Sequence, residues 1–224
     1  MEKLLRLLIN LMNKLFKQIY NMKTIFISIM LISLILNLGF SQKYTSFDEA
    51  LANPSNVQTL DLRMQNLNSL SSEIGNFTNL KILHLVGNSL TSLPVEIGNL
   101  TNLEVLSVSS NALTSLPSSI GNLTKLKVLI LADNQLDSLP MELSSLVNLQ
   151  TLHLRNNNIT VFPKEVFAMT SLTDLNLANN KITELPADFS NLARLNTLDI
   201  SGNTIDTKIL KKELKAFKDT EVTF

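Results

Sequence analysis

The chain repeats itself: residues 80–102 read LKILHLVGNSLTSLPVEIGNLTN, and residues 103–125 read LEVLSVSSNALTSLPSSIGNLTK. The same 23-residue period runs without insertion through seven copies, the last of them partial. The copies begin at Val57, Leu80, Leu103, Leu126, Leu149, Leu172 and Leu195. Positions 1, 4, 6, 11, 14, 18 and 21 of the copies are apolar throughout, at 46 residues in all. This regularity predicts a solenoid, in which each unit buries its apolar side chains against its neighbours.

The order of residues within one copy predicts its local structure. Positions 4 and 6, such as Leu83 and Leu85, face one side of a short strand, and position 5 faces the other side. Stacked copies then form a parallel sheet with one buried face. Proline at position 15 suits the first turn of a short helical segment, because it fixes φ and lacks an N–H group. Glycine at position 19 is expected to end that segment with positive φ, at Gly75, Gly98 and Gly121.

Asparagine occupies position 9 of every repeat except the first. Its amide is expected to bond to backbone groups where the chain leaves the strand, a structural role. These residues are Asn88, Asn111, Asn134, Asn157, Asn180 and Asn203. Gln65 takes the same place in the first repeat, where it is expected to loosen the ladder of asparagines.

These residues resemble the leucine-rich repeat family, in its 23-residue LxxLxLxxNxLxxLPxxIxxLxxL form. That form occurs in bacterial proteins and in Ras-suppressor and scribble-like scaffolds. The resemblance covers residues 57–205 as seven repeats. It implies an α/β solenoid, a horseshoe with a parallel concave β-sheet and short 3-10, helical or irregular turns on the convex side. It implies nothing about a ligand.

Segments on either side of the repeats are expected to cap the ends of the solenoid. Residues 43–56 predict an N-terminal capping helix over Ser46–Leu51, and they resemble the corresponding segment of secreted bacterial leucine-rich repeat proteins. Residues 206–224 predict a C-terminal capping helix and strand. The helix has apolar residues at helical spacing, Ile209, Leu210, Leu214 and Phe217, and the strand is expected within residues 220–224.

Residues 22–42 read MKTIFISIMLISLILNLGFSQ and predict a signal peptide, cleaved after Ser41 or Gln42. The apolar run over 24–38 is short for a membrane span, which needs about 20 residues. The expected location is the periplasm, the cell surface or the medium. The alternative is a membrane anchor formed by residues 24–40. Residues 1–21 are interpreted as an over-long gene model, or else as an amphipathic basic helix on a membrane surface.

Composition excludes several classes of function. Lys and Arg together number 19, as do Asp and Glu, so the basic surface typical of nucleic-acid binding is missing. The chain has no Cys, which excludes disulfides, cysteine-zinc sites, iron–sulfur clusters and thiol nucleophiles. With two His and no Trp, no metal and no cofactor is expected.

Position 5 places Asp61, His84 and Ser107 on adjacent strands, a succession that invites comparison with a catalytic triad. Neighbouring strands lie about 4.8 Å apart with parallel side chains, whereas a triad needs hydrogen bonds near 3 Å. We therefore expect no enzymatic activity. His84 and His153 are three repeats apart, roughly 15 Å, too far to share a metal ion.

Positions 3, 5, 7 and 8 form the predicted concave face, where aliphatic residues gather on repeats two to four. Such residues indicate a surface covered by a partner, or simply the β-propensity of Val and Ile. Both interpretations stay open. Charged and polar residues flank the cluster, at Asp61 and Arg63 on one side and at Asp174, Asn176 and Asp199 on the other. The candidate protein-binding face comprises Ile82, His84, Val86, Val105, Ser107, Val128, Ile130, Ala132, His153 and Arg155.

The sequence favours an exported, non-enzymatic module that binds an unidentified protein through this concave face. An intracellular scaffold or regulator of a small GTPase or phosphatase is the first alternative. The adaptor part of a secreted enzyme is a second and less favoured one. No nucleic-acid partner is expected, and the membrane is a partner only through an uncleaved N-terminal segment.

Overall fold

The structure is a computed structural model that describes residues 43–186, 190–206 and 220–224. The chain divides into two compact units, Met1–Ser41 and Gln42–Phe224. All residues that the structure describes belong to the second unit. None of the helices in the described residues is long and apolar enough to cross a membrane.

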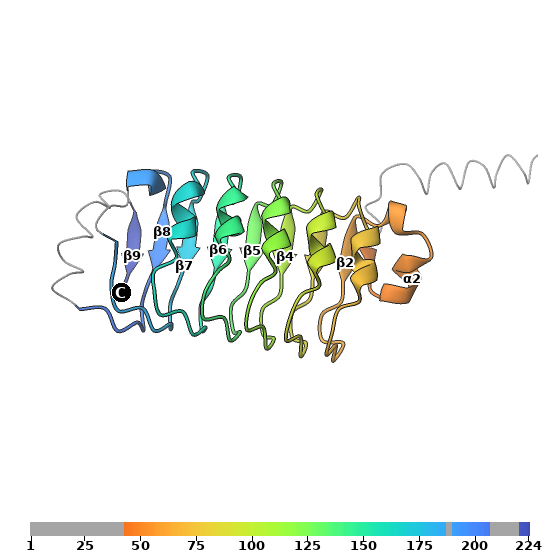
Figure 1. Cartoon of the computed structure of the whole chain (residues 1–224), viewed down its shortest axis with the longest axis horizontal. Helices are drawn as coiled ribbons and strands as arrows, with labels where there is room; N and C mark the ends of the chain where they lie inside the picture. Colours follow the sequence, from red (N-terminus) through yellow and green to blue (C-terminus); the bar gives the residue numbers. More distant parts are fainter. Residues whose placement is uncertain (1–42, 187–189, 207–219) are drawn as a thin grey trace, which may run out of the picture. The chain divides into compact units, whose positions relative to one another are not determined.

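The described residues form nine strands in one sheet, hydrogen-bonded in chain order and parallel throughout (Figure 1). They are β1 Lys43–Tyr44, β2 Thr59–Asp61, β3 Ile82–His84, β4 Val105–Ser107, β5 Val128–Ile130, β6 Thr151–His153, β7 Asp174–Asn176, β8 Thr197–Asp199 and β9 Glu221–Thr223. From β2 to β8, each repeat position pairs with the same position of the next repeat, as Leu83 does with Leu106. The predicted parallel sheet is confirmed, and every position forms a straight column across it.

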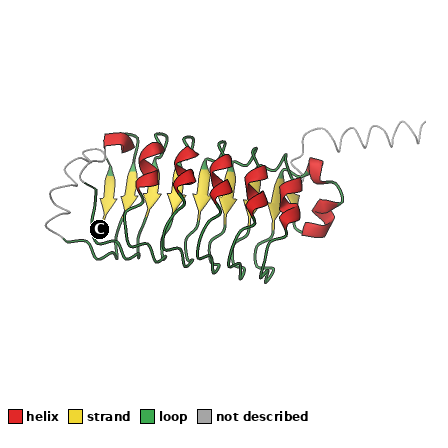
Figure 2. Cartoon of the chain, viewed as in Figure 1, coloured by secondary structure: helices red, strands yellow, loops and turns green. Residues whose placement is uncertain are grey.

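One 3-10 turn follows the strand in each full repeat, and Figure 2 shows turns and strands as two rows. The 3-10 segments are η1 Pro54–Asn56, η2 Ser72–Asn76, η3 Val95–Asn99, η4 Ser118–Asn122, η5 Met141–Ser145, η6 Lys164–Ala168 and η7 Ser190–Leu192. The position-15 prolines lie one residue earlier than expected. Pro94 and Pro117, for example, precede η3 and η4 with φ of −67° and −68° and extended ψ.

The position-19 glycines are needed for a different reason from the predicted positive φ. Positive φ among the described glycines occurs only at Gly87 and Gly202. A Cβ on Gly98 would lie 2.6 Å from the Ser119 carbonyl oxygen, and one on Gly121 would lie 2.5 Å from that of Glu142. Glycine is therefore required because the 3-10 turns of neighbouring repeats approach too closely for a side chain.

Nearly all of the predicted apolar framework is buried in one continuous core. Among the described framework residues, four are half-buried: Leu67, Leu139, Leu185 and Ile205. Phe189 lies outside the described residues. At the N-terminal end, Phe47 meets Phe77 edge to face, with ring centroids 5.6 Å apart, and so covers the first repeat.

The predicted asparagine ladder is confirmed, and it joins each repeat to the one before. Asn134 Oδ1 accepts from the Leu113 N–H at 3.0 Å, and its Nδ2 donates to the carbonyls of Val108 and Leu131, also at 3.0 Å. Gln65 has a different bonding partner from the asparagines. Its Nε2 donates to the Thr45 carbonyl at 2.6 Å, which ties the first repeat to the cap.

The N-terminal cap contains the predicted helix, α2 Phe47–Leu51, whose first turn is capped by Ser46 accepting from the Glu49 N–H. It also contains strand β1, which the sequence did not predict. At the other end, β9 confirms the expected strand. The helix expected around Ile209 to Phe217 lies outside the described residues.

Candidate functional site

The candidate site lies on the face of the sheet opposite the leucine core. In β5, Leu129 is fully buried, while Val128 and Ile130 on either side of it are half-buried. The pairing of strands places Ile82, Val105 and Val128 in one column and His84, Ser107 and Ile130 in the next. Six aliphatic residues of this face are half-buried, and we call them the apolar strip: Ile82, Val86, Val105, Val128, Ile130 and Ala132.

The remaining predicted residues of the face differ in exposure. Ser107 is buried within the strip, and His84 and His153 are half-buried on either side of it. The two histidines lie three strands apart, on β3 and β6. Arg155 is exposed. The structure thus brings the aliphatic residues together and keeps the histidines apart.

Beside the strip on β1 and β2 lies a cluster of three charges. Asp61 is only 6% exposed. Arg63 donates to it from Nε at 2.8 Å and from Nη2 at 2.6 Å, and Lys43 Nζ lies 2.8 Å from Asp61 Oδ2. The Arg63 guanidinium holds the pKa of Asp61 well below its usual range, opposed by burial and assisted by Lys43. The two cations leave the cluster with one net positive charge.

His84 lies between this cluster and the strip. Burial lowers its pKa, and the positive charges of Arg63 and Lys43 add to this effect, while Asp61 opposes it. No hydrogen bond in the described part of the chain joins His84 to Asp61 or Ser107, and Arg63 already occupies both carboxylate oxygens of Asp61. Asp61, His84 and Ser107 are therefore neighbours in one column of the surface, without the contacts of a triad.

On the other side of the strip, carboxylates form a polar network across β6, β7 and β8. His153 Nε2 lies 2.8 Å from Asp174 Oδ2, and Thr197 donates to Asp174 Oδ1 at 2.7 Å. Asn176 donates to Asp199 at 3.1 Å. His153, Asp174, Asn176 and Asp199 could be placed on this face from the sequence, but the pair between His153 and Asp174 was not predicted. This pair could have been found from the sequence, because position 5 on one strand lies diagonally opposite position 3 on the next strand.

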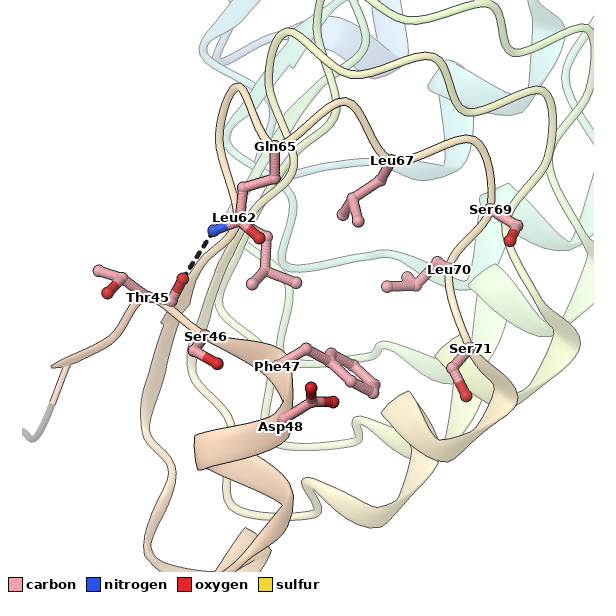
Figure 3. A pocket seen from close by; sticks show the side chains of 10 residues that line it. All are labelled: Thr45, Ser46, Phe47, Asp48, Leu62, Gln65, Leu67, Ser69, Leu70 and Ser71. Carbon is pink, nitrogen blue, oxygen red and sulfur yellow. Dashed lines mark hydrogen bonds between the residues drawn. The ribbon is translucent and has the colours of Figure 1, made fainter.

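No group of three or more His, Cys, Asp or Glu suited to a metal ion occurs in the ranges that the structure describes. Two hollows lie away from the strip. One of about 450 Å³ opens between the N-terminal cap and the first repeat, where Phe47, Leu67 and Leu70 line it among hydroxyl groups (Figure 3). The other, of about 330 Å³, is lined by residues 137–139 and 159–165. The sequence did not predict either hollow.

Three family descriptions match overlapping parts of the chain, which together run from residue 50 to residue 205. They are a leucine-rich repeat region at residues 50–135, leucine-rich repeats in two copies at 124–165, and a leucine-rich repeat at 147–205. A comparison with curated proteins gave no match.

Solved structures that are similar come from bacteria and a plant. A leucine-rich repeat protein of Leptospira interrogans is 29% identical, with TM-score 0.64, over 82% of this chain and 58% of that one. A second similar structure is the leucine-rich repeat ectodomain of an Arabidopsis thaliana membrane receptor kinase, in complex with Casparian strip integrity factor 2. It is 28% identical, with TM-score 0.65, and the match covers 75% of this chain and 21% of the ectodomain. An internalin of Listeria monocytogenes is 23% identical, with TM-score 0.67, and the match covers 84% of this chain and 53% of the internalin.

The chain spans less than two thirds of the length of each of these proteins. What they share with it is the coil of short parallel strands joined by turns. With the unbroken 23-residue period and the overlapping family matches, this coil shows that the chain is a leucine-rich repeat protein.

Proposed function

We propose that the chain is an exported, non-enzymatic recognition module that binds a protein on the open face of its sheet. Leucine-rich repeat domains typically mediate binding between proteins. The apolar strip is the observation that carries the proposal. Its six aliphatic side chains are half-exposed in the described structure, although burying them would be favourable, and a protein partner would bury them.

The strip is a suitable docking surface because its residues are already ordered. Each lies in or beside a strand that is hydrogen-bonded on both sides, so a partner does not have to order the backbone. The Arabidopsis ectodomain, which is similar over 75% of this chain, was solved in complex with Casparian strip integrity factor 2. That complex supports a polypeptide as the class of partner.

Export is supported by the position at which the repeat unit begins. The compact unit starts at Gln42, and β1 starts at Lys43. The sequence predicts cleavage after Ser41 or Gln42, so the predicted cleavage point coincides with the start of this unit. Cleavage there would leave all described strands, turns and core residues in one piece. An uncleaved apolar segment at 24–40 would instead anchor the unit to a membrane.

The N-terminus of the mature protein tests the export proposal. Mass spectrometry of protein recovered from the native host should find a first residue of Gln42 or Lys43, and the protein should be outside the cytoplasm. Soluble cytoplasmic protein that retains residues 1–42 would contradict export, and would favour the intracellular scaffold.

Charge substitutions in the strip test the binding face. Val128→Asp and Ile130→Asp should each abolish capture of the partner from the native environment, because binding would bury an unpaired carboxylate. Ser118→Asp and Lys164→Glu, at exposed first residues of η4 and η6, should leave capture unchanged. Circular dichroism should show that all four variants are folded. A partner that tolerates the strip variants but is lost with the turn variants would place the site on the 3-10 turns.

A further inference from the structure

The charges at the two ends of the apolar strip are unequal in sign. At the end formed by β1 and β2, Lys43 and Arg63 share the single carboxylate of Asp61, which leaves one positive charge in excess. The side chains of Lys43 and Arg63 are 52% and 51% exposed, so this charge reaches the surface. We call this set the basic end.

At the end formed by β6, β7 and β8, carboxylates are in excess. Asp174 and Asp199 share positions 3, 5 and 7 of these strands with a single arginine, Arg155, and no lysine, and His153 Nε2 lies 2.8 Å from Asp174 Oδ2. The Asp174 side chain is 39% exposed, and the exposed carboxylate of Asp133, which follows β5, accepts a hydrogen bond from Asn156 Nδ2. We call Asp174 and Asp199 the acidic end. Between the two ends, the described face presents only uncharged side chains at positions 3 and 5 of β3, β4 and β5, His84 being neutral at neutral pH.

We infer that the partner presents an extended, apolar polypeptide segment that crosses the strands, with a carboxylate over the basic end and an ammonium or guanidinium group over the acidic end. This inference rests on the proposed function and specifies the chemistry of the partner. Complementary charges orient such a segment on the strip, and like charges at either end would oppose its docking.

Distances across the sheet set the length of the segment. From β2 to β7 there are five strand spacings of about 4.8 Å, or roughly 24 Å. An extended chain advances about 3.3 Å per residue, so roughly eight residues reach from one end to the other. This distance exceeds the Debye length of about 8 Å at physiological salt, so each end acts on its own part of the segment.

Peptide libraries test this inference on the full chain. Three displayed libraries of eight-residue peptides would share a randomised centre and differ in their fixed ends, which are Glu and Lys, Glu and Glu, or Lys and Lys. We expect the wild-type chain to enrich apolar centres from the Glu and Lys library above the other two. We also expect Val128→Asp to abolish this enrichment.

Two arginines at repeat position 7 provide a matched pair of variants. Arg63→Gln removes a cation from the basic end, and should weaken binding of the enriched peptides by about two- to fivefold, as for an exposed ion pair. Arg155→Gln removes a cation beside the acidic end, and should strengthen binding of the same peptides, because less positive charge then opposes their cationic end. Both effects should diminish at high salt. Circular dichroism would check that both variants are folded.

The outcomes separate this inference from the proposed function. The wild-type chain could enrich peptides equally from all three libraries, and these peptides could fail to bind the Val128→Asp variant. That result would overturn the inferred charges of the partner but would still support the strip as the binding face. Peptides retained equally by Val128→Asp would overturn both. Failure to enrich any peptide would overturn the segment as partner. So would a dimer in sedimentation that Val128→Asp dissociates, because the strip would then bind a second copy of the chain.

Discussion

Gly98 and Gly121 lie where the 3-10 turns of neighbouring repeats touch. Their hydrogen atoms face the backbone carbonyls of Ser119 and Glu142, at distances that no side chain could tolerate. In later repeats Ser144 and Phe167 occupy the same position, and Phe167 packs its ring 5.9 Å from that of Phe162. Both of these later side chains contact their own repeat, since Ser144 Oγ donates to the Met141 carbonyl at 2.6 Å and Phe162 belongs to the same repeat as Phe167.

Gly121→Ala tests this contact. The added Cβ would lie 2.5 Å from the Glu142 carbonyl oxygen, so the turns must separate. We expect the free energy of unfolding to fall by about 1–3 kcal/mol, as in overpacked cores. Ser144→Ala, at the equivalent position of the next repeat, is the control and should cost less, because it removes only an exposed hydrogen bond to Met141. Chemical denaturation measures both. Equal stability of wild type and Gly121→Ala would show that the turns can move apart freely.

Some residue-level features could be predicted and others were misassigned. The asparagine ladder followed directly from the recurrence of one residue type at position 9. Positive φ occurs instead at position 8 of each repeat and at Asn66. The position-8 residues are Met64, Gly87, Ser110, Asp133, Asn156, Asn179 and Gly202. Most of these are Gly, Asn or Asp, the residues that tolerate this conformation, so the signal was present. Met64 and Ser110 obscured it, because the fold imposes the conformation on them as well.

At the level of elements, β1 adds a strand of only two residues to the edge of the sheet. Lys43 pairs with Thr59 and Tyr44 pairs with Leu60 of β2. The ion pair from Lys43 to Asp61 adds a second link between the strands. Two residues carry no readable alternation, so β1 could not be predicted.

The strip could be predicted, because alternation along each strand fixes which side chains share a face. Its ion pairs could not, because they depend on side-chain conformations between repeats.

The link between β1 and β2 should depend on pH. The pKa of Asp61 is lower in the folded chain than in the unfolded one, so its ionised form stabilises the fold above about pH 4. That contribution is lost progressively as the pH falls below this value. Asp61→Asn should reduce stability at neutral pH and flatten the acid side of the curve of unfolding free energy against pH. A variant with the wild-type slope below pH 4 would show that other carboxylates cause the acid dependence.

At the scale of the whole unit, stability is shared between neighbouring repeats. Each strand pairs only with the strands of adjacent repeats, and each asparagine bonds backbone groups of its own repeat and of the preceding one. Damage in the middle of such an array breaks interfaces on both sides, whereas damage near an end can open locally. The solenoid itself could be predicted because the period is unbroken. The hollow at the N-terminal cap could not, because it depends on how a unique segment packs on the first repeat.

Two equivalent substitutions test this distribution of stability. Leu129 in β5 is fully buried and Leu198 in β8 is 1% exposed, and both occupy repeat position 4. Leu129→Ala should lower the free energy of unfolding by about 2–5 kcal/mol through the cavity it leaves. Native-state hydrogen exchange should show faster exchange in repeats on both sides of it. Leu198→Ala leaves a similar cavity, but its effect should concentrate in β7, β8 and β9, with the slowest amides of β3 to β5 nearly unchanged. Equal loss of protection throughout the unit in both variants would mean that the array unfolds only as a whole. Each local cavity would then weaken every repeat alike.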